Sequence, residues 1–150
     1  MTAANPLAIT TWNVISVRIR LDGVAALVDA HEPDVLCLQE TKVVNGSFPL
    51  DAFEALGYVH SVINGIKGYN GVAILSKRPI DDLITRLPGD DDDEQARYIE
   101  AVIGDVRVAS IYLPNGNPVD GPKLPYKLAW MDRLYAVSYT HLTLPTKRIV

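Results

Sequence analysis

Apolar residues along the chain fall into short runs typical of strands, separated by one longer segment with helical spacing. The segments Leu7 to Val14 and Val35 to Leu38 are rich in apolar and β-branched residues, which favours strands. Between them, Arg18 to His31 predicts an amphipathic helix that ends before Pro33. This strand–helix–strand order predicts two parallel strands whose carboxyl ends lie at one edge of a sheet.

The rest of the chain predicts further strands and two more helices. Strands are expected over Tyr58–Ile63, Val72–Ser76, Tyr98–Ile103 and Val106–Leu113. A glycine-rich loop separates the first pair and a tight turn at 104–105 joins the second pair, so each pair is expected to form a hairpin. Helices are expected over Pro49–Leu56 and Tyr126–Ala136, the latter packing through Leu128, Met131, Leu134 and Tyr135.

Length and composition indicate one soluble globular domain. The chain has 150 residues, of which 48% are hydrophobic and 21% charged, enough for a sizeable core. The only cysteine, Cys37, lies within an apolar strand and is expected to be a small core residue. The start of the sequence lacks the pattern of a secretory signal, and no apolar run is long enough to cross a bilayer. A cytoplasmic protein is therefore expected.

Candidate chemistry begins where the second predicted strand ends. Gln39, Glu40 and Lys42 follow the apolar run directly, and Asn13 lies near the end of the first strand. Ligands bind outside the carboxyl ends of strands in open α/β sheets, so we expect Asn13 and Glu40 to converge there. A carboxylate held by a strand suits Mg²⁺, which takes one or two protein carboxylates together with phosphate oxygens. An isolated Glu would more often be a surface residue.

Charge elsewhere gives weaker signals. The net charge of −4 argues against indiscriminate nucleic-acid binding but leaves room for a local basic groove. The loop 64–71 carries Lys67 and Tyr69, suited to a phosphate and to a sugar or base, although residue types alone slightly favour an ordinary hairpin loop. The acidic run 89–94 indicates a solvated turn rather than a metal site.

Three motifs occur in an order that resembles the exonuclease III family of abasic-site DNA endonucleases, within the endonuclease/exonuclease/phosphatase superfamily. They are Gln39-Glu40-Thr41-Lys42, Gly68-Tyr69-x-Gly71-Val72-Ala73 and Tyr112-Leu113-Pro114-Asn115-Gly116. The resemblance runs from about Ile9 to about Ala136. It implies an α/β fold, the four-layer α/β/β/α sandwich of the DNase I-like type, of which residues 1–136 supply only the first half. A sheet face is then expected to remain uncovered.

The resemblance also implies a function. It implies Mg²⁺-dependent, or else Mn²⁺-dependent, hydrolysis of double-stranded DNA at abasic sites and 3′ ends by a monomeric repair enzyme. Glu40 and Asn13 would hold the metal, and Tyr112 would contact the phosphate or orient a neighbouring acid. The residues that would bind DNA are Arg18, Lys42, Lys67, Tyr69, Arg97 and Asn115.

The sequence departs from the family pattern in three respects. Ile15 occupies a position where the family has Asn or Asp, through natural variation or a sequencing error. The motifs of the family's second half are absent. Residues 137–150 resemble translated sequencing-adapter read-through, so we expect a non-native tail and assign no role to His141.

These departures predict that the chain alone is inactive, and they leave two alternatives open. One is a phosphoesterase of the same superfamily that acts on inositol phosphates or phospholipid headgroups. The other is a non-catalytic module that binds DNA or protein.

Overall fold

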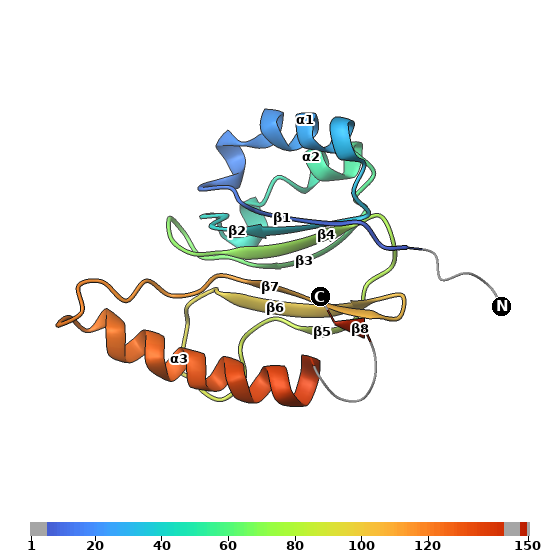
Figure 1. The fold of residues 1–150 in the computed structure, drawn as a ribbon. Coiled ribbons are helices and arrows are strands. Elements are labelled where there is room, and N and C mark those ends of the chain that lie inside the picture. The colour runs from blue at the N-terminus through green and yellow to red at the C-terminus, as the bar shows by residue number, and fades with distance from the viewer. Residues whose placement is uncertain (1–5, 143–147, 150) are drawn as a thin grey trace.

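The computed structural model describes residues 6–142 and 148–149. Two sheets pack face to face, with α1 and α2 over the outer face of one sheet and α3 against the outer face of the other (Figure 1). This arrangement of layers confirms the predicted α/β/β/α sandwich. Among the described residues, no helix is both long enough and apolar enough to span a membrane.

The first sheet has the strand order β1-β2-β4-β3. Its strands are β1 (Ile9–Asn13), β2 (Val35–Gln39), β3 (His60–Asn64) and β4 (Val72–Ser76). β1 and β2 are parallel, as the strand–helix–strand pattern predicts, and β4 is antiparallel to both β2 and β3. β3 and β4 therefore form the predicted hairpin.

The second sheet has the order β5-β6-β7-β8. Its strands are β5 (Asp81–Ile84), β6 (Tyr98–Ile103), β7 (Val106–Ile111) and β8 (Arg148–Ile149). β6 and β7 form the predicted antiparallel hairpin, and β8 pairs with β7 in parallel. The sequence did not predict β5, a mostly exposed strand that pairs irregularly with β6.

Helical segments connect the strands and cover the sheets. They are η1 (Val17–Ile19), α1 (Leu21–His31), η2 (Asn45–Ser47), α2 (Leu50–Ala55), α3 (Lys123–Val137) and the π-helical turn η3 (Ser138–Leu142). The predicted helix over Arg18–His31 is thus divided into a 3-10 turn and α1. The boundary predicted after Ala136 falls within the last turn of α3. Residues 143–147 and 150 of the predicted tail lie outside the described residues, and its non-native origin stays a prediction.

Alternate residues of the central strands build two separate cores. Leu36 and Leu38 of β2 pack under α1 and α2, whereas Val35 and Cys37 face the second sheet. Burial raises the pKa of the Cys37 thiol to about 12, consistent with the predicted core role.

A third core lies between α3 and the second sheet, and it corrects two expectations. α3 packs through Tyr126, Trp130, Leu134 and Val137, whereas Leu128, Met131 and Tyr135 are exposed, so the predicted packing face was largely wrong. The indole of Trp130 has more apolar area to bury than the side chains on the predicted face. Because helices lie on both outer faces, the expectation of an uncovered sheet face is also wrong (Figure 1).

Candidate metal and nucleic-acid site

The parallel pairing of β1 and β2 brings Asn13 and Glu40 together. Asn13 lies opposite Gln39 in the sheet register, one residue before Glu40. Asn13 Nδ2 donates a hydrogen bond of 2.9 Å to Glu40 Oε1, and Asn13 Oδ1 accepts one of 3.2 Å from the backbone N–H of Ile15. The convergence expected from topology is therefore confirmed.

Tyr112 reaches the same carboxylate from the second sheet. It follows β7 on the face that packs against the first sheet. Its hydroxyl donates a hydrogen bond of 2.8 Å to Glu40 Oε1. Residues 72 positions apart in the sequence thus meet at one oxygen atom, and Tyr112 is placed to orient this acid.

The loop before β4 supports the turn that carries Glu40. The backbone N–H of Thr41 donates to the Gly71 carbonyl at 3.3 Å, and that of Lys42 donates to the Asn70 carbonyl at 3.0 Å. A Cβ atom on Gly71 would lie 2.0 Å from Thr41 Oγ1, so only glycine allows this close approach.

Left-handed backbone conformations concentrate around this turn. The described part of the chain has seven non-glycine residues with positive φ, and five of them lie in the loops that meet here: Ile15, Ser16, Glu40, Lys42 and Asn70. Such conformations cost about 1–3 kcal/mol each and are retained at functional sites where the surrounding structure enforces them. The strain therefore marks these loops as a candidate functional site.

Glu40 is held in its ionised form. Partial burial alone would raise the pKa of Glu40, but hydrogen bonds from Asn13, Tyr112 and Lys42 and the charge of Lys42 outweigh it and lower the pKa below its ordinary value. Lys42 Nζ lies 3.4 Å from Glu40 Oε2. The carboxylate is therefore charged at neutral pH.

The donor set at this turn fits a hard cation that retains much of its own hydration. No group of three or more His, Cys, Asp or Glu residues suited to a metal occurs among residues 6–142 and 148–149. Glu40 supplies one carboxylate, which is enough for Mg²⁺ when phosphate and water complete its shell. Asn13 turns its amide nitrogen toward Glu40, so its contact orients the carboxylate that would bind the metal.

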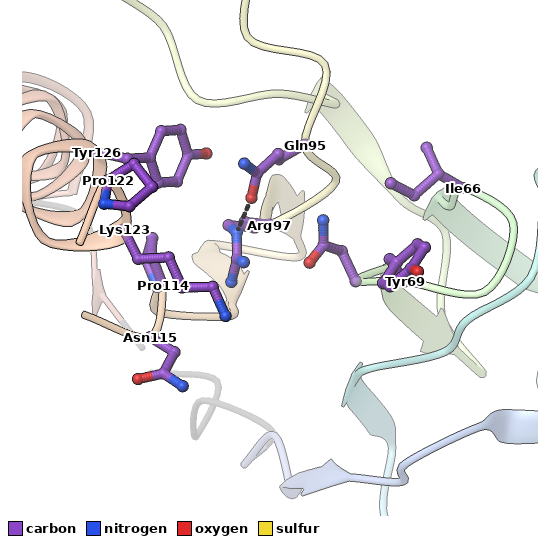
Figure 2. Close-up of a pocket in the computed structure, with 10 residues that line it drawn as sticks. Ile66, Tyr69, Gln95, Arg97, Pro114, Asn115, Pro122, Lys123 and Tyr126 are labelled. Carbon is purple, nitrogen blue, oxygen red and sulfur yellow. Dashed lines mark hydrogen bonds between the residues drawn. The ribbon is translucent and has the colours of Figure 1, made fainter. Parts of the chain in front are cut away.

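A pocket of about 510 Å³, whose lining residues are drawn in Figure 2, adjoins the turn through Asn70, which lines the pocket and accepts the hydrogen bond from the Lys42 backbone N–H. Three of the predicted DNA-binding residues, Tyr69, Arg97 and Asn115, line it. Figure 2 shows Arg97 between Tyr69 on one side and Lys123 on the other. Tyr69 is 72% exposed, so its ring is available to stack on a sugar or base.

Arg97 links the pocket to Glu40 through Tyr112. Its guanidinium carbon lies 4.8 Å from the centre of the Tyr112 ring, and its Nη1 donates to the Tyr112 carbonyl at 3.3 Å. Arg97 Nε donates to Gln95 Oε1 at 2.7 Å (Figure 2). The pocket and the carboxylate thus belong to one connected site.

The remaining predicted DNA-binding residues lie outside the pocket lining. Arg18 is exposed on η1, Lys67 is exposed in the loop before β4, and Lys42 pairs with Glu40. Sequence reasoning missed Asn70, Gln95, Lys123 and Tyr126, which do line the pocket. Lys123 begins α3 three residues before the predicted helix start, and this position among prolines and glycines was its only signal.

One residue of the acidic run is not a solvated turn residue. The Asp93 side chain is only 8% exposed, and it accepts hydrogen bonds from Tyr126 and Arg133 of α3. Burial would raise the pKa of Asp93, but hydrogen bonds from Gln95, Arg133 and Tyr126 and the charge of Arg133 hold it below the ordinary value. Asp93 therefore ties the acidic loop to the helix beside the pocket.

Comparison with known proteins identifies relatives of this chain by sequence. The chain is 36% identical over 110 residues to exodeoxyribonuclease III of Haemophilus influenzae, covering 71% of this chain and 41% of that protein. It is 32% identical over 133 residues to DNA repair nuclease APEX1 of Danio rerio, covering 85% of this chain and 42% of that protein. The chain thus spans less than half the length of these relatives.

Solved structures of related proteins superimpose closely on this chain. An AP endonuclease from Archaeoglobus fulgidus superimposes with a TM-score of 0.85 at 42% identity, covering 91% of this chain and 52% of that one. A 3′-5′ exonuclease from Neisseria meningitidis superimposes with a TM-score of 0.83 at 42% identity, covering 87% and 50%. Residues 10–150 match the model of the endonuclease/exonuclease/phosphatase family, and this chain therefore belongs to that family.

Proposed function

We propose that this chain forms part of a Mg²⁺-dependent DNA repair nuclease, with Mn²⁺ as a substitute, that cuts double-stranded DNA at abasic sites and trims 3′ ends. The observation that carries the proposal is the ionised Glu40 carboxylate, held by Asn13 and Tyr112 beside a pocket lined by Arg97 and Lys123. The names of its relatives, exodeoxyribonuclease III and AP endonuclease, support it.

In this proposal Glu40 holds the metal and its neighbours fix the carboxylate. A bound divalent ion would neutralise charge on the phosphodiester during hydrolysis. Asn13 and Tyr112 both donate to Oε1, so they restrict rotation of the Glu40 carboxylate. Burial, the hydrogen bond to Glu40 and the charge of Glu40 raise the pKa of Tyr112 above its ordinary value. The phenol therefore stays protonated and can donate to a phosphate oxygen.

Binding of the DNA backbone is assigned to the positive residues around Glu40. Arg97 and Lys123 line the pocket, and Lys42 lies at the metal-binding turn. Contacts of this kind position the backbone and weaken as salt rises. The net charge of −4 keeps non-specific binding weak, so these few cations would confine DNA to one face.

The proposal is tested by assaying the full gene product on an abasic DNA duplex and on a panel of phosphoinositides, with Mg²⁺, with Mn²⁺ and with a chelator. We expect metal-dependent cutting of the abasic duplex, reduced at least about 100-fold in Glu40→Gln because the metal loses its carboxylate. The 150-residue chain alone is expected to turn over little.

Two results would replace the proposal with an alternative. Hydrolysis confined to the phosphoinositides would identify a different phosphoesterase of the same family. Binding of abasic DNA without any cutting in the presence of either metal would identify a non-catalytic module, for which the apolar Ile15 next to Asn13 would be the first explanation.

A further inference from the structure

A buried polar contact joins the two sheets next to the Glu40 turn. Gln39, at the end of β2, is 8% exposed, and Ser110 of β7 is 1% exposed. Gln39 Nε2 lies 3.0 Å from Ser110 Oγ, and Ser110 Oγ lies 3.1 Å from the Leu38 carbonyl oxygen. The contact therefore crosses from one sheet to the other at the strand ends that carry the site.

The direction of these hydrogen bonds is fixed by their chemistry. A carbonyl oxygen can only accept, so the Ser110 hydroxyl donates its single proton to Leu38. The Ser110 oxygen must then accept from the Gln39 amide. The side-chain amide of Gln39 and the hydroxyl of Ser110 thus form a directional link, which Ala or Met cannot reproduce.

The position of this contact is unusual among the buried polar residues. Five buried polar or charged residues occur in the described part of the chain: Gln39, Thr41, Ser76, Glu100 and Ser110. Of these, Gln39 and Ser110 bond to each other across the two sheets, beside a core of apolar side chains that includes Val35, Cys37 and Val108. Apolar packing has no preferred direction, whereas a satisfied buried hydrogen bond specifies one alignment of its partners.

The alignment specified by the Gln39–Ser110 hydrogen bond also sets the relative positions of Glu40 and Tyr112. Glu40 follows Gln39 directly, and Tyr112 lies two residues after Ser110 on the same face of the strand. The Tyr112 hydroxyl and the Glu40 carboxylate are 2.8 Å apart, a distance that tolerates little sliding of one sheet over the other.

We propose that Gln39 and Ser110 are positioning residues that hold the sheet bearing Tyr112 in register with the sheet bearing Glu40. Their role in the reaction rests on the function proposed above, but the positioning itself does not. Neither residue is placed to touch the substrate, because both are buried between the sheets.

The kinetic test uses Ser110→Ala and Gln39→Met in the full gene product, with Ser110→Thr as the conservative variant that keeps the hydroxyl. We expect kcat on abasic DNA to fall about 10- to 100-fold, since a misplacement of about 1 Å costs up to about 100-fold. KM should stay within about twofold, because binding residues are untouched. Ser110→Thr should recover most of the rate. In a protein that already carries Tyr112→Phe, adding Ser110→Ala should lower kcat little further, since both substitutions act through the Tyr112 hydroxyl.

The matched control is Thr11→Val. Thr11 Oγ1 also bonds to Gln39, at 3.1 Å from Nε2, but Thr11 lies on β1 of the same sheet. Its loss removes a hydrogen bond to Gln39 without removing the connection between sheets. We expect kcat to remain within about twofold of the parent protein.

A readout independent of activity comes from ¹⁹F NMR of the full gene product labelled with fluorotyrosine, with the Tyr112 signal assigned by Tyr112→Phe. Ser110→Ala should shift or broaden that signal, while the signal of Tyr58, which lies in the core beneath α1 and α2, stays unchanged. Thr11→Val should leave both signals unchanged. An unchanged Tyr112 signal in folded Ser110→Ala and Gln39→Met would overturn the inference, as would rate losses additive with Tyr112→Phe. If the parent protein cuts no DNA, the proposed function fails, and the NMR result alone decides the positioning role.

Discussion

Replacing Gly71 by Ala tests whether the loop before β4 sets the position of the Glu40 turn. Gly71 has a φ of 97°, and an added Cβ would lie 2.0 Å from Thr41 Oγ1 and 3.1 Å from the Lys42 backbone nitrogen, where ordinary contacts are 3.4 Å or longer. The left-handed backbone costs a non-glycine residue about 1–2 kcal/mol, and the forced shift adds about 1–3 kcal/mol. We expect Gly71→Ala to lower the free energy of unfolding by about 2–5 kcal/mol.

Gly68→Ala is a matched control within the same loop. Gly68 also has a positive φ, of 78°, but nothing lies within 4 Å of the position of its Cβ. It should therefore show the backbone cost of about 1–2 kcal/mol without the steric cost. The difference between the two variants isolates the contact with the turn that follows Glu40.

The assay is urea denaturation of both variants, followed by tryptophan fluorescence, with the slope of each transition compared. Thr41→Ala should recover part of the stability of Gly71→Ala, because it removes the nearest atom, and Thr41 Oγ1 has no hydrogen-bond partner in the described structure. Equal losses for Gly68→Ala and Gly71→Ala, or no recovery with Thr41→Ala, would refute the close approach of the loop.

Three further predictions concern separate parts of the site. Ile15→Asn should stabilise the protein by about 1 kcal/mol in a denaturant titration, because Ile15 has a φ of 45°, which Asn tolerates and a β-branched residue does not; no gain would contradict this. Asp93→Asn should cost about 1.5–3 kcal/mol at pH 7, through the lost ion pair with Arg133. Because folding lowers the pKa of Asp93, the stability that its carboxylate provides is present above the ordinary Asp pKa of about 3.9 and is lost as the pH falls through the lower folded value. The unfolding free energies of the parent protein and Asp93→Asn should therefore converge in acid, and a difference that stays constant with pH would contradict the pairing. Lys123→Ala should weaken DNA binding and reduce the dependence of log K on log salt by about one unit, whereas Lys77→Ala, outside the pocket, should change neither.

Local pattern was sufficient to predict one half of the site. The convergence of Asn13 and Glu40 followed from the parallel strand–helix–strand rule, which depends only on neighbouring elements. The pairing of Glu40 with Tyr112 lies across two sheets, and no local rule specifies which residues of separate sheets meet. The family motifs pointed to both residues without predicting the hydrogen bond between them.

The packing of α3 shows a second limit of prediction from the sequence. The helix has apolar residues on more than one face, so spacing alone does not decide which face is buried. The structure buries Trp130 at 1% exposure and leaves Met131 exposed, because the helix must also place Tyr126 and Arg133 against Asp93. This contact with the acidic loop overrode the simplest helical pattern, and with it Lys123 came to line the pocket.

Gln39 and Glu40 show why the remaining geometry could not be predicted from strand alternation. Successive residues of a regular strand point to opposite faces, so Glu40 would be expected on the face of Leu36 and Leu38, beneath the helices. Instead Gln39 contacts Ser110 and Glu40 contacts Tyr112, both in or after β7. The left-handed backbone of Glu40, with a φ of 54°, breaks the alternation and turns two consecutive side chains to the same side. A conformation that is unfavourable for Glu in isolation is thus the feature that lets a single strand end supply both the buried link between the sheets and the accessible carboxylate beside it.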